Sequence, residues 1–293
     1  MIGKRTAISI AIAIAGAAAL VLGIGMGRCG AAAAADERAA IGEGREAGLT
    51  VGLPPAVTDR IYAASWAAGR PIVVIDPGHG GSDPGAVSVS GEASEKQLTL
   101  ALARELRDKL VERGRVRVAM TRDSDVYLGL EERAAVARRL GASLFLSLHM
   151  DSAPNPLARG ASIYSLSDVA SDAEAQRFAA AENRGGALDG EDQASVPAML
   201  ADLAMRDQMS ASADLAARLA RKSAGRFELR PEPHRFAAFH VLRRAETPAV
   251  LFEAGYISNV DDEQLLRAPE YRAKIALALA QAVEADVAWR SQR

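Results

Sequence analysis

Residues 72–86 read IVVIDPGHGGSDPGA, and the interpretation of the whole chain begins from this stretch. It starts as four consecutive apolar residues, a pattern typical of a short buried strand. It continues as a turn that holds four glycines and two prolines around one histidine, His79. In open α/β sheets, ligands gather where a strand ends in a loop at its carboxyl end. We therefore expect His79 to lie at the edge of a sheet where a ligand could bind.

Strand patterns and helical patterns alternate after this stretch. Strands are predicted over residues 72–75, 116–121, 144–149, 161–166, 239–242 and 249–252, and helices over residues 94–112, 130–140 and about 270–289. Ser94 is the predicted N-cap of the first helix. This alternation predicts an α/β fold with a largely parallel sheet that helices cover on both faces.

Residues 167–225 do not follow the alternation. They are almost all helix-forming residues, interrupted near residues 185–190, and contain no strand pattern. We interpret them as a helical insertion between two strands of the sheet. Insertions of this length usually lie over a functional face or are mobile, and we expect this one to lie over the active-site face.

The first 35 residues have the layout of an export signal. Lys4 and Arg5 precede an uncharged stretch over residues 6–27, and alanines fill residues 31–35. The uncharged stretch is also long enough to span a bilayer, so cleavage in the alanines is our first expectation and a retained membrane anchor our second. Either outcome predicts a protein of the periplasm or cell envelope, with membrane contact only if the segment is retained.

Residues 36–70 are rich in alanine and glycine, and we predict that they form a linker with a short helix over residues 59–68. Cys29 is the only cysteine, so cleavage in the alanines would leave no thiol and no disulfide framework. Residues 36–293 carry 32 Lys and Arg against 37 Asp and Glu, a formal charge of −5. This mildly acidic body argues against a nucleic-acid partner, which normally demands a basic face.

Four side chains that could do chemistry lie near predicted strand ends. His79 follows the first strand, His149 ends the third and Glu253 follows the last, while Glu95 begins the helix after the glycine-rich loop. Two imidazoles and one carboxylate are a known ligand set of catalytic zinc, which leaves a fourth position for water. A second carboxylate could carry the proton from water to the leaving group. Spacing alone does not decide which glutamate would bind metal and which would carry the proton.

Taken singly, some of these residues have ordinary explanations. His149 could be a strand-end histidine with satisfied hydrogen bonds, and Glu95 could be the common acidic residue at a helix N-terminus. Glu253 is harder to explain in this way, because a carboxylate that ends an apolar run needs a partner or a role. A phosphate-binding loop is disfavoured, since the chain has neither GxGxxG nor GK[ST] after the first strand.

The remaining histidines and three aspartates have structural interpretations. His240 lies in a strand pattern and is expected to be a packed or surface residue, and His234, which follows Pro233 in a Pro-flanked turn, is not assigned. Asp76 and Asp83 each precede a proline, so we predict that they order the loop through Asx-type hydrogen bonds. Asp151 is expected to support the strand-end histidine two residues before it.

The strings IDPGHGGSDPGA, LFLSLHMDSAPNP, RGASIYSLS and PAVLFEAGYISNVDDE, together with the glutamate after the first, closely resemble the zinc-dependent N-acetylmuramoyl-L-alanine amidases of bacterial cell walls. The resemblance covers residues 71–287. It implies hydrolysis of the amide between the lactyl group of N-acetylmuramic acid and the first L-alanine of the stem peptide. The implied fold is a single α/β domain over residues 71–290 with a mixed, mainly parallel sheet, and we expect a monomer that acts on peptidoglycan.

The resemblance also assigns the two glutamates. By matching motif positions, His79, Glu95 and His149 would bind one zinc ion per chain, and Glu253 would be the catalytic carboxylate. Met150 departs from the family, in which a small residue usually follows this histidine, and we expect it to narrow the cleft.

Residues 173–186, AEAQRFAAAENRGG, resemble the helix that covers the zinc cleft in the daughter-cell-separation amidases. In those enzymes a glutamate of the helix can occupy the open metal position until an activator displaces it, and Glu182 is the candidate in this chain. A carboxylate in that position would exclude the catalytic water and produce an off state. The resemblance thus implies a protein activator and a role in cell-wall remodelling and daughter-cell separation.

Two other functions remain open from the sequence. A zinc peptidase that cuts within the stem peptide would share the metal chemistry and differ only in its pocket. A non-catalytic wall-binding or regulatory protein on the same scaffold is disfavoured, because all four chemical positions are filled.

Overall fold

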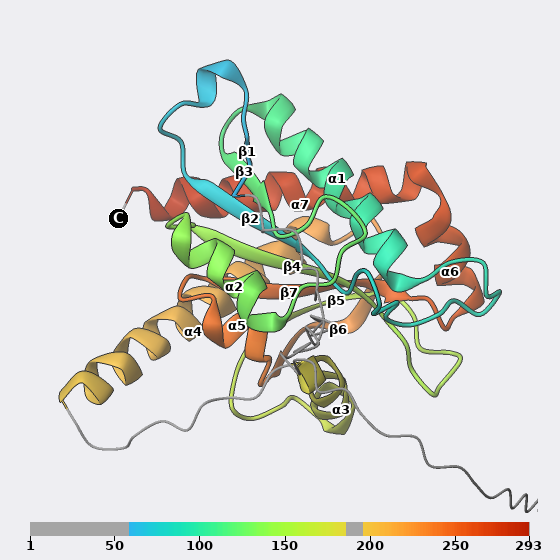
Figure 1. Cartoon of the computed structure of the whole chain (residues 1–293). Coiled ribbons are helices and arrows are strands. Elements are labelled where there is room, and N and C mark those ends of the chain that lie inside the picture. The colour runs from blue at the N-terminus through green and yellow to red at the C-terminus, as the bar shows by residue number, and fades with distance from the viewer. Residues whose placement is uncertain (1–58, 186–195, 293) are drawn as a thin grey trace, which may run out of the picture. The chain divides into compact units, whose positions relative to one another are not determined.

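The computed structural model describes residues 59–185 and 196–292. In these residues seven strands form one mixed sheet in the order β1-β3-β2-β4-β7-β5-β6 (Figure 1). Their bounds are β1 Ile61–Tyr62, β2 Ile72–Pro77, β3 Arg117–Met120, β4 Leu144–Asp151, β5 Ala161–Leu166, β6 Leu229–Ala237 and β7 Ala249–Tyr256. Only the pairs β1–β3 and β5–β7 are antiparallel. The prediction of an α/β fold with a mainly parallel sheet is confirmed.

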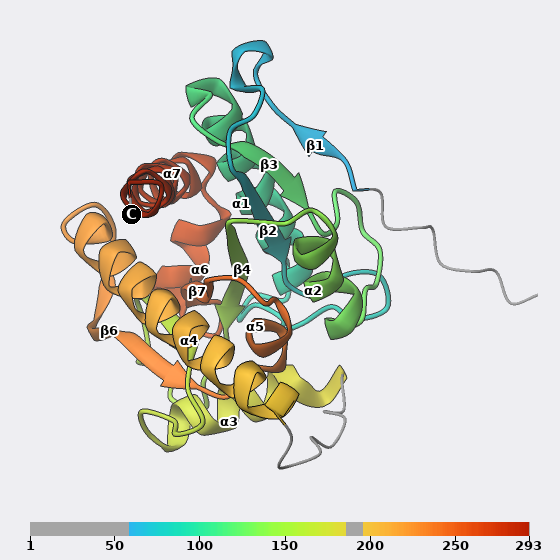
Figure 2. The same ribbon diagram turned by 90° about the vertical axis from the view of Figure 1, so that its left-hand side faces the viewer.

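Helices cover both faces of this sheet. They are α1 Glu95–Arg113, α2 Leu130–Arg139, α3 Ala173–Glu182, α4 Val196–Ser223, α5 His240–Arg244, α6 Val260–Arg267 and α7 Pro269–Arg290. One hydrophobic core lies between the sheet and helices α1, α4 and α7, and a second lies between the sheet and helices α2, α3 and α5. Figure 2 shows α7 and α3 on opposite sides of the sheet.

The side chains of β4 alternate between the two faces of the sheet. Every residue of β4 is buried, as is usual for a parallel strand covered by helices on both faces. Leu146, Leu148 and Met150 join the core beside α1 and α7, and Phe145 joins the other core. Because side chains alternate along a strand, His149 lies on the face that α2, α3 and α5 cover. Met150 therefore points away from that face, and the expectation that it narrows the cleft is wrong.

Helix α1 begins and packs as its sequence predicts. Ser94 is its N-cap, and the Ser94 backbone N–H donates to Oε1 of Gln97 at 3.0 Å. The leucines at four-residue spacing are buried in the first core: Leu98, Leu102, Leu106 and Leu110. This packing holds the N-terminus of α1, and with it Glu95, against the loop that follows β2.

The structure differs from the sequence prediction around residue 240. Residues 239–242 are not a strand, since helix α5 begins at His240 with Phe239 as its N-cap. On the side away from β7, strand β5 pairs instead with β6. Because β6 contains Pro231 and Pro233, its sequence shows no strand pattern. Proline is tolerated there because β6 is an edge strand and needs ladder hydrogen bonds on one side only. Helix α6 was not predicted either.

The predicted insertion consists of two unlike parts. Leu215, Ala216 and Leu219 of α4 are buried in the first core, so α4 is part of the domain's packing and not an addition to it. Helix α3 lies over the face that carries His149, where Ala175 and Ala179 are buried in the second core, and Met205 and Met209 of α4 also pack against that core.

The predicted segments over residues 1–35 and most of 36–70 lie outside the described residues. Residues 59–68, expected to form a short helix, hold strand β1 and a 3-10 turn over Ser65–Ala67. Strand β1 pairs with β3, so the sheet begins ahead of residue 71. Of the helices that the structure describes, none has the length and apolar character needed to cross a membrane.

Candidate active site

The carboxyl end of the central strands carries a row of polar side chains. His149 of β4 is the register partner of Glu253 of β7, and Glu253 is in turn the partner of Ser162 of β5. Register partners point to the same face of a sheet, so all three lie on the α3 side. The loop after β2 adds His79 and the start of α1 adds Glu95, and both line the same cavity of about 670 Å³ as His149. The sequence thus predicted correctly which elements converge.

Glycines allow the loop after β2 to approach the other elements closely. His79 has a φ of 59°, in the left-handed region that non-glycine residues seldom adopt. A Cβ on Gly78 would lie 2.5 Å from Cε1 of His149. A Cβ on Gly85 would lie 2.6 Å from both Oε2 of Glu95 and Cδ2 of His79. Larger residues at these two positions would therefore push the convergent side chains apart.

Two buried arginines hold this loop through its backbone carbonyls. Arg133 of α2 donates to the carbonyls of Pro77 and His79, both at 2.7 Å, and to that of Leu128 at 3.0 Å. Arg122, which follows β3, donates to the carbonyls of Pro77 and Gly78 at 3.0 and 2.8 Å. Burial, followed by the neighbouring Arg133 charge, lowers the pKa of Arg122 to about 10. By binding these carbonyls, the two guanidinium groups hold the backbone of His79 in its left-handed conformation.

The two aspartates of the loop have different roles. Asp83 accepts a hydrogen bond from the Gly85 backbone N–H at 3.0 Å, which is the predicted Asx-type bond. Asp76 does not make such a bond, because its carboxylate is buried beneath the loop. It pairs with Arg133 at 2.8 Å and accepts from the hydroxyls of Thr121 and Ser147 at 2.6 and 2.8 Å. Burial raises the pKa of Asp76, but Arg133 and the two hydroxyls outweigh burial and hold it below its usual range.

The imidazoles present one nitrogen each to a shared point. Nδ1 of His79 lies 2.8 Å from Oδ2 of Asp83, which orients the ring and leaves Nε2 facing the cavity. Nε2 of His79 lies 3.0 Å from Oε2 of Glu95, and Nδ1 of His149 lies 3.0 Å from Oε1 of Glu95. Backbone N–H groups of Ala86 and Met150 also donate to these two oxygens, so the carboxylate is fixed between the rings.

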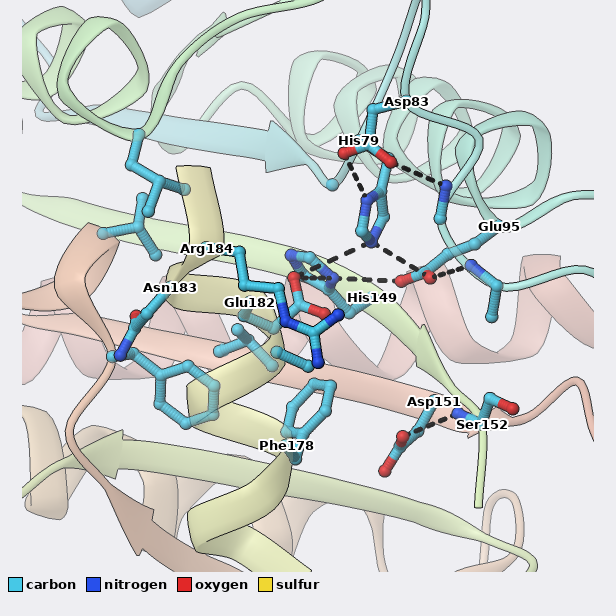
Figure 3. Close-up of a pocket in the computed structure, with 18 of the residues that line it drawn as sticks. His79, Asp83, Glu95, His149, Asp151, Ser152, Phe178, Glu182, Asn183 and Arg184 are labelled. Atoms are coloured by element: carbon cyan, nitrogen blue, oxygen red, sulfur yellow. Dashed lines mark hydrogen bonds and ion pairs between the residues drawn. The ribbon is translucent and has the colours of Figure 1, made fainter. Parts of the chain in front are cut away.

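Glu182, at the end of α3, reaches the same point from the side opposite the loop of His79 (Figure 3). Its Oε2 lies 3.7 Å from Nε2 of His79 and 3.4 Å from Nδ1 of His149. Ligand atoms of these three residues all lie within 4.8 Å of one another, a spacing that could hold a metal ion. Glu95 contacts the two rings through different carboxylate oxygens, so these oxygens lie beside the group formed by His79, His149 and Glu182 and not within it. Among the described residues, the buried Nε2 of His79 makes no hydrogen bond of normal geometry, although it lies 3.0 Å from Oε2 of Glu95, as a nitrogen that binds a metal between them would.

Electrostatics favours charged groups at this point. Burial raises the pKa of Glu95, but the two imidazoles outweigh it and bring the pKa below its usual range. Burial lowers the pKa of His79, but the charge of the adjacent Glu95 carboxylate outweighs it and raises the pKa to about 10. The site is therefore built to concentrate negative charge around the imidazoles, which suits a divalent cation.

Glu253 is fully buried, and neither of its carboxylate oxygens has a hydrogen-bond partner among the described residues. Burial, together with the charges of Asp151, Glu95 and Glu182, raises the pKa of Glu253 well above its usual range. A buried carboxyl without a partner is costly for folding, so its retention points to a chemical role.

Asp151 does not support His149 in the way that was expected. Its carboxylate accepts from the backbone N–H of Ser152 at 2.6 Å instead. Burial, opposed in part by this bond, raises the pKa of Asp151 to about 7. Because Asp151 lines the cavity, it adds a second carboxyl of high pKa to the region around Glu253.

Helix α3 is fixed over the cavity at both ends by contacts that were not predicted. At its C-terminal end, Asn183 donates to the Ala238 carbonyl at 2.7 Å and accepts from the His240 backbone N–H at 2.8 Å. At its N-terminal end, Arg230 donates to both carboxylate oxygens of Glu174 at 2.7 and 3.0 Å. Four-residue spacing could have revealed the inward stripe of α3 in the sequence, but not these partners.

A ring of α3 fills the space between its two ends. The centroid of Phe178 lies 5.5 Å from that of Tyr164, 5.4 Å from that of Phe239 and 6.5 Å from that of His149. Phe178 therefore covers the site beside the imidazoles, as Figure 3 shows. No signal in the sequence beyond its place on the helical stripe marked this residue.

Comparison with known proteins identifies the family. Residues 73–285 match the family model described as N-acetylmuramoyl-L-alanine amidase. The chain belongs to this amidase family. Over 231 residues the amidase is 35% identical to N-acetylmuramoyl-L-alanine amidase AmiA of Escherichia coli strain K12, a match that covers 77% of this chain and 79% of AmiA.

Other relatives agree with this assignment. The amidase is 34% identical over 220 residues to AmiC of Neisseria meningitidis, which covers 73% of this chain and 52% of that relative. The crystal structure of an N-acetylmuramoyl-L-alanine amidase from Clostridium difficile 630 matches with a TM-score of 0.55 and 26% identity, covering 73% of this chain and 95% of that one. The amidase is therefore an enzyme that hydrolyses the bond between N-acetylmuramic acid and L-alanine in peptidoglycan.

Proposed function

We propose that the amidase binds one zinc ion through Nε2 of His79, Nδ1 of His149 and the carboxylate of Glu95. The observation that supports this proposal best is the convergence of the two imidazole nitrogens on a buried, ionised carboxylate. Two histidines and a glutamate are a known ligand set of catalytic zinc. A bound zinc ion would lower the pKa of a water ligand and polarise the scissile carbonyl.

We propose that Glu253 carries the proton during hydrolysis. Its raised pKa makes the ionised carboxylate a stronger base toward the attacking water, and the proton that it then holds can pass to the alanine nitrogen as the amide bond breaks. Its register position beside His149 places it next to the ligand set. The buried setting also excludes bulk water, which strengthens the electrostatic contacts within the cavity.

We propose further that α3 keeps the enzyme in an off state. The Glu182 carboxylate lies within 3.7 Å of both imidazole nitrogens, close enough to fill the remaining position on a metal bound there. An activator protein would then switch the enzyme on by drawing α3 away. Substituting Glu182→Gln would weaken this block and raise the basal rate of peptidoglycan hydrolysis, whereas an unchanged rate would contradict it.

Digestion of purified sacculi tests the central proposal. The amidase should release glycan strands free of peptide, and EDTA should stop the release until zinc is restored. Mass spectrometry of the products separates this activity from cleavage within the stem peptide, which would leave part of the peptide on the sugar. Cleavage that continues in EDTA would contradict zinc dependence.

Two variants separate metal binding from proton transfer. Glu253→Gln should keep zinc at one ion per chain and lose turnover by at least about 100-fold, the usual contribution of a general base. His79→Ala should lose both zinc and turnover. Full activity or full zinc stoichiometry in His79→Ala would refute the assignment of the ligands.

The sequence also supports a location and a biological role for this activity. We propose that the protein is exported to the periplasm or cell envelope, because Lys4 and Arg5 and the uncharged stretch over residues 6–27 have the layout of an export signal. There the amidase would act on peptidoglycan during wall remodelling and daughter-cell separation. Fractionation of cells that express the full chain would test the location, and the length of cell chains in a deletion strain would test the role.

A further inference from the structure

The inward face of α3 carries three residues at four-residue intervals: Glu174, Phe178 and Glu182. Residues at this spacing lie one above the other along a helix. Glu182 reaches the two imidazoles at one end, the Phe178 ring fills the middle, and Glu174 is bound at the other end. With a rise of about 1.5 Å per residue, the Cα atoms of the two glutamates are separated by about 12 Å along the helix axis.

The groups that bind Glu174 belong to the sheet and not to α3. Arg230 of β6 holds both carboxylate oxygens, and the Tyr256 hydroxyl of β7 donates to one of them at 2.9 Å. Arg235 of β6 lies 3.5 Å from the other oxygen. Arg235 is 5% exposed; it also pairs with Asp172, the N-cap of α3, and its Nε has no hydrogen-bond partner among the described residues. A forked guanidinium, a second cation and a hydroxyl together match the shape and charge of a carboxylate.

This carboxylate site adjoins the proposed zinc site. Glu174 and Asp151 line the same cavity as His79 and His149. Tyr256 of β7 is the register partner of Asp151 of β4, and Asp151 lies two residues beyond His149 on that strand. The site would be open toward the cavity once the Glu174 side chain left, because α3 is the element that covers it.

We propose that Arg230, Tyr256 and Arg235 form a subsite for a carboxylate of the stem peptide, which Glu174 fills while α3 is in place. This inference rests on the proposed function, because the scissile amide must lie at the zinc site for the spacing to have meaning. An extended peptide spans about 3.3–3.6 Å per residue, so about 12 Å corresponds to three or four residues. The ligand is therefore a carboxylate carried by the residues that follow the first L-alanine.

In this scheme α3 imitates the substrate at two points. Glu182 takes the place of the substrate group that would lie at the metal, and Glu174 takes the place of a carboxylate of the stem peptide. Stem peptides whose carboxylates are converted to carboxamides would lose the contact with Arg230, since a neutral amide cannot form the same charged pair. The subsite would thus select the charge state of the stem peptide.

Steady-state kinetics on two soluble substrates tests the subsite. One substrate is a muramoyl tripeptide with free carboxylates, and the other is the same molecule with these groups amidated. The parent enzyme is the full chain with Glu174→Gln and Glu182→Gln, which removes the charges of both glutamates on the inward face of α3. Adding Arg230→Gln should raise KM for the acidic substrate about 10- to 100-fold and leave kcat unchanged, the loss expected for hydrogen bonds to a charged group.

Two comparisons make the test specific. The amidated substrate should give the same high KM with and without Arg230→Gln. Arg226→Gln removes a nearby exposed arginine that bonds to Gln281, and it should leave KM for both substrates unchanged. Arg230→Lys keeps the charge without the fork, so it should raise KM for the acidic substrate alone. This variant preserves the test if Arg230→Gln does not fold.

The outcomes distinguish the two proposals. If the parent enzyme binds zinc and cleaves both substrates with one KM, or if Arg230→Gln and Arg230→Lys change KM equally for both, the subsite is refuted and the zinc amidase stands. If the parent enzyme neither binds zinc nor cleaves either substrate, the proposed function is refuted, and the subsite with it.

Discussion

Replacing Arg133 by glutamine would remove a cation that both pairs with a buried carboxylate and holds the loop of His79. Arg133 lies 2.8 Å from Asp76, and the side chains of both are less than 5% exposed. Removing one partner of a buried ion pair costs about 3–5 kcal/mol, because the other charge stays buried without compensation. We expect Arg133→Gln to lower the free energy of unfolding by about this amount, as measured by urea denaturation in EDTA.

The pH dependence of this loss identifies its cause. In the native protein the pKa of Asp76 is below its usual range, so its stabilising contribution is present above the unfolded pKa and is lost as pH falls through the folded pKa. Without Arg133, burial is less opposed and raises the pKa of Asp76, which then destabilises the fold when ionised. The deficit of the variant should therefore be large at pH 7 and small near pH 4. A deficit that does not vary with pH would refute the role of Asp76.

The same variant tests whether the loop position matters for metal binding. Loss of the hydrogen bond to the His79 carbonyl should weaken zinc affinity about 10- to 100-fold, the usual effect of residues that orient metal ligands. Arg272→Gln is the matched control, because Arg272 is also buried and donates to two backbone carbonyls, those of Leu266 and Arg267, away from the site. It should lose stability but keep zinc affinity in a chelator competition assay. Equal losses of affinity in both variants would refute the positioning argument.

Three further predictions concern the loop and α3. Gly85→Ala would place a Cβ 2.6 Å from a carboxylate oxygen of Glu95, so zinc stoichiometry by atomic absorption should fall, whereas Gly91→Ala, with a similar φ of +75° and no atom within 4 Å, should keep it. Phe178→Ala removes the half-buried ring by which α3 packs over the cavity. If about 1.4 kcal/mol of packing energy is lost, α3 should leave the site about tenfold more often and basal amidase activity should rise about tenfold. The hydrogen bond from its arginine partner lowers the pKa of Glu174 from 4.5, so this contact is present above that pH and is lost as pH falls through the lowered value. Limited proteolysis of α3 should accordingly increase in acid, and Glu174→Gln should show the increase at neutral pH as well.

The convergence of the site was visible in the sequence because strand ends are visible there. His79, His149 and Glu253 each follow or end a run of apolar residues, and the carboxyl ends of parallel strands meet at one edge of a sheet. Glu95 could be added because α1 returns from that edge. These four residues were therefore placed together correctly, while their individual roles remain predictions.

The sequence could not reveal side-chain contacts to backbone groups. It also could not reveal contacts that form only when a helix packs against the sheet. Arg122 and Arg133 hold the loop through carbonyl oxygens, which every residue possesses, and the carboxylate partner of Arg133, Asp76, was expected to bond within its own loop. The stripe of α3 was recognisable, but its partners on β6 were not, because Pro231 and Pro233 hid that strand. Likewise, the burial of Leu215 on α4 depends on packing against the sheet, so α4 was grouped with α3 by composition alone.

The position of β7 in the sheet has a consequence for how the chain becomes active. β7 is the last strand in the sequence, yet it lies between β4 and β5, which precede it by about a hundred residues. Pairings between distant segments form slowly, because a long loop must close before the contact is gained. The segment that completes the sheet also carries Glu253, so a folding intermediate in which β7 is not yet paired lacks the proposed proton carrier as well. If Glu253 has the proposed role, pairing of β7 and onset of peptidoglycan cleavage coincide, which would protect the cell wall from a partly folded enzyme.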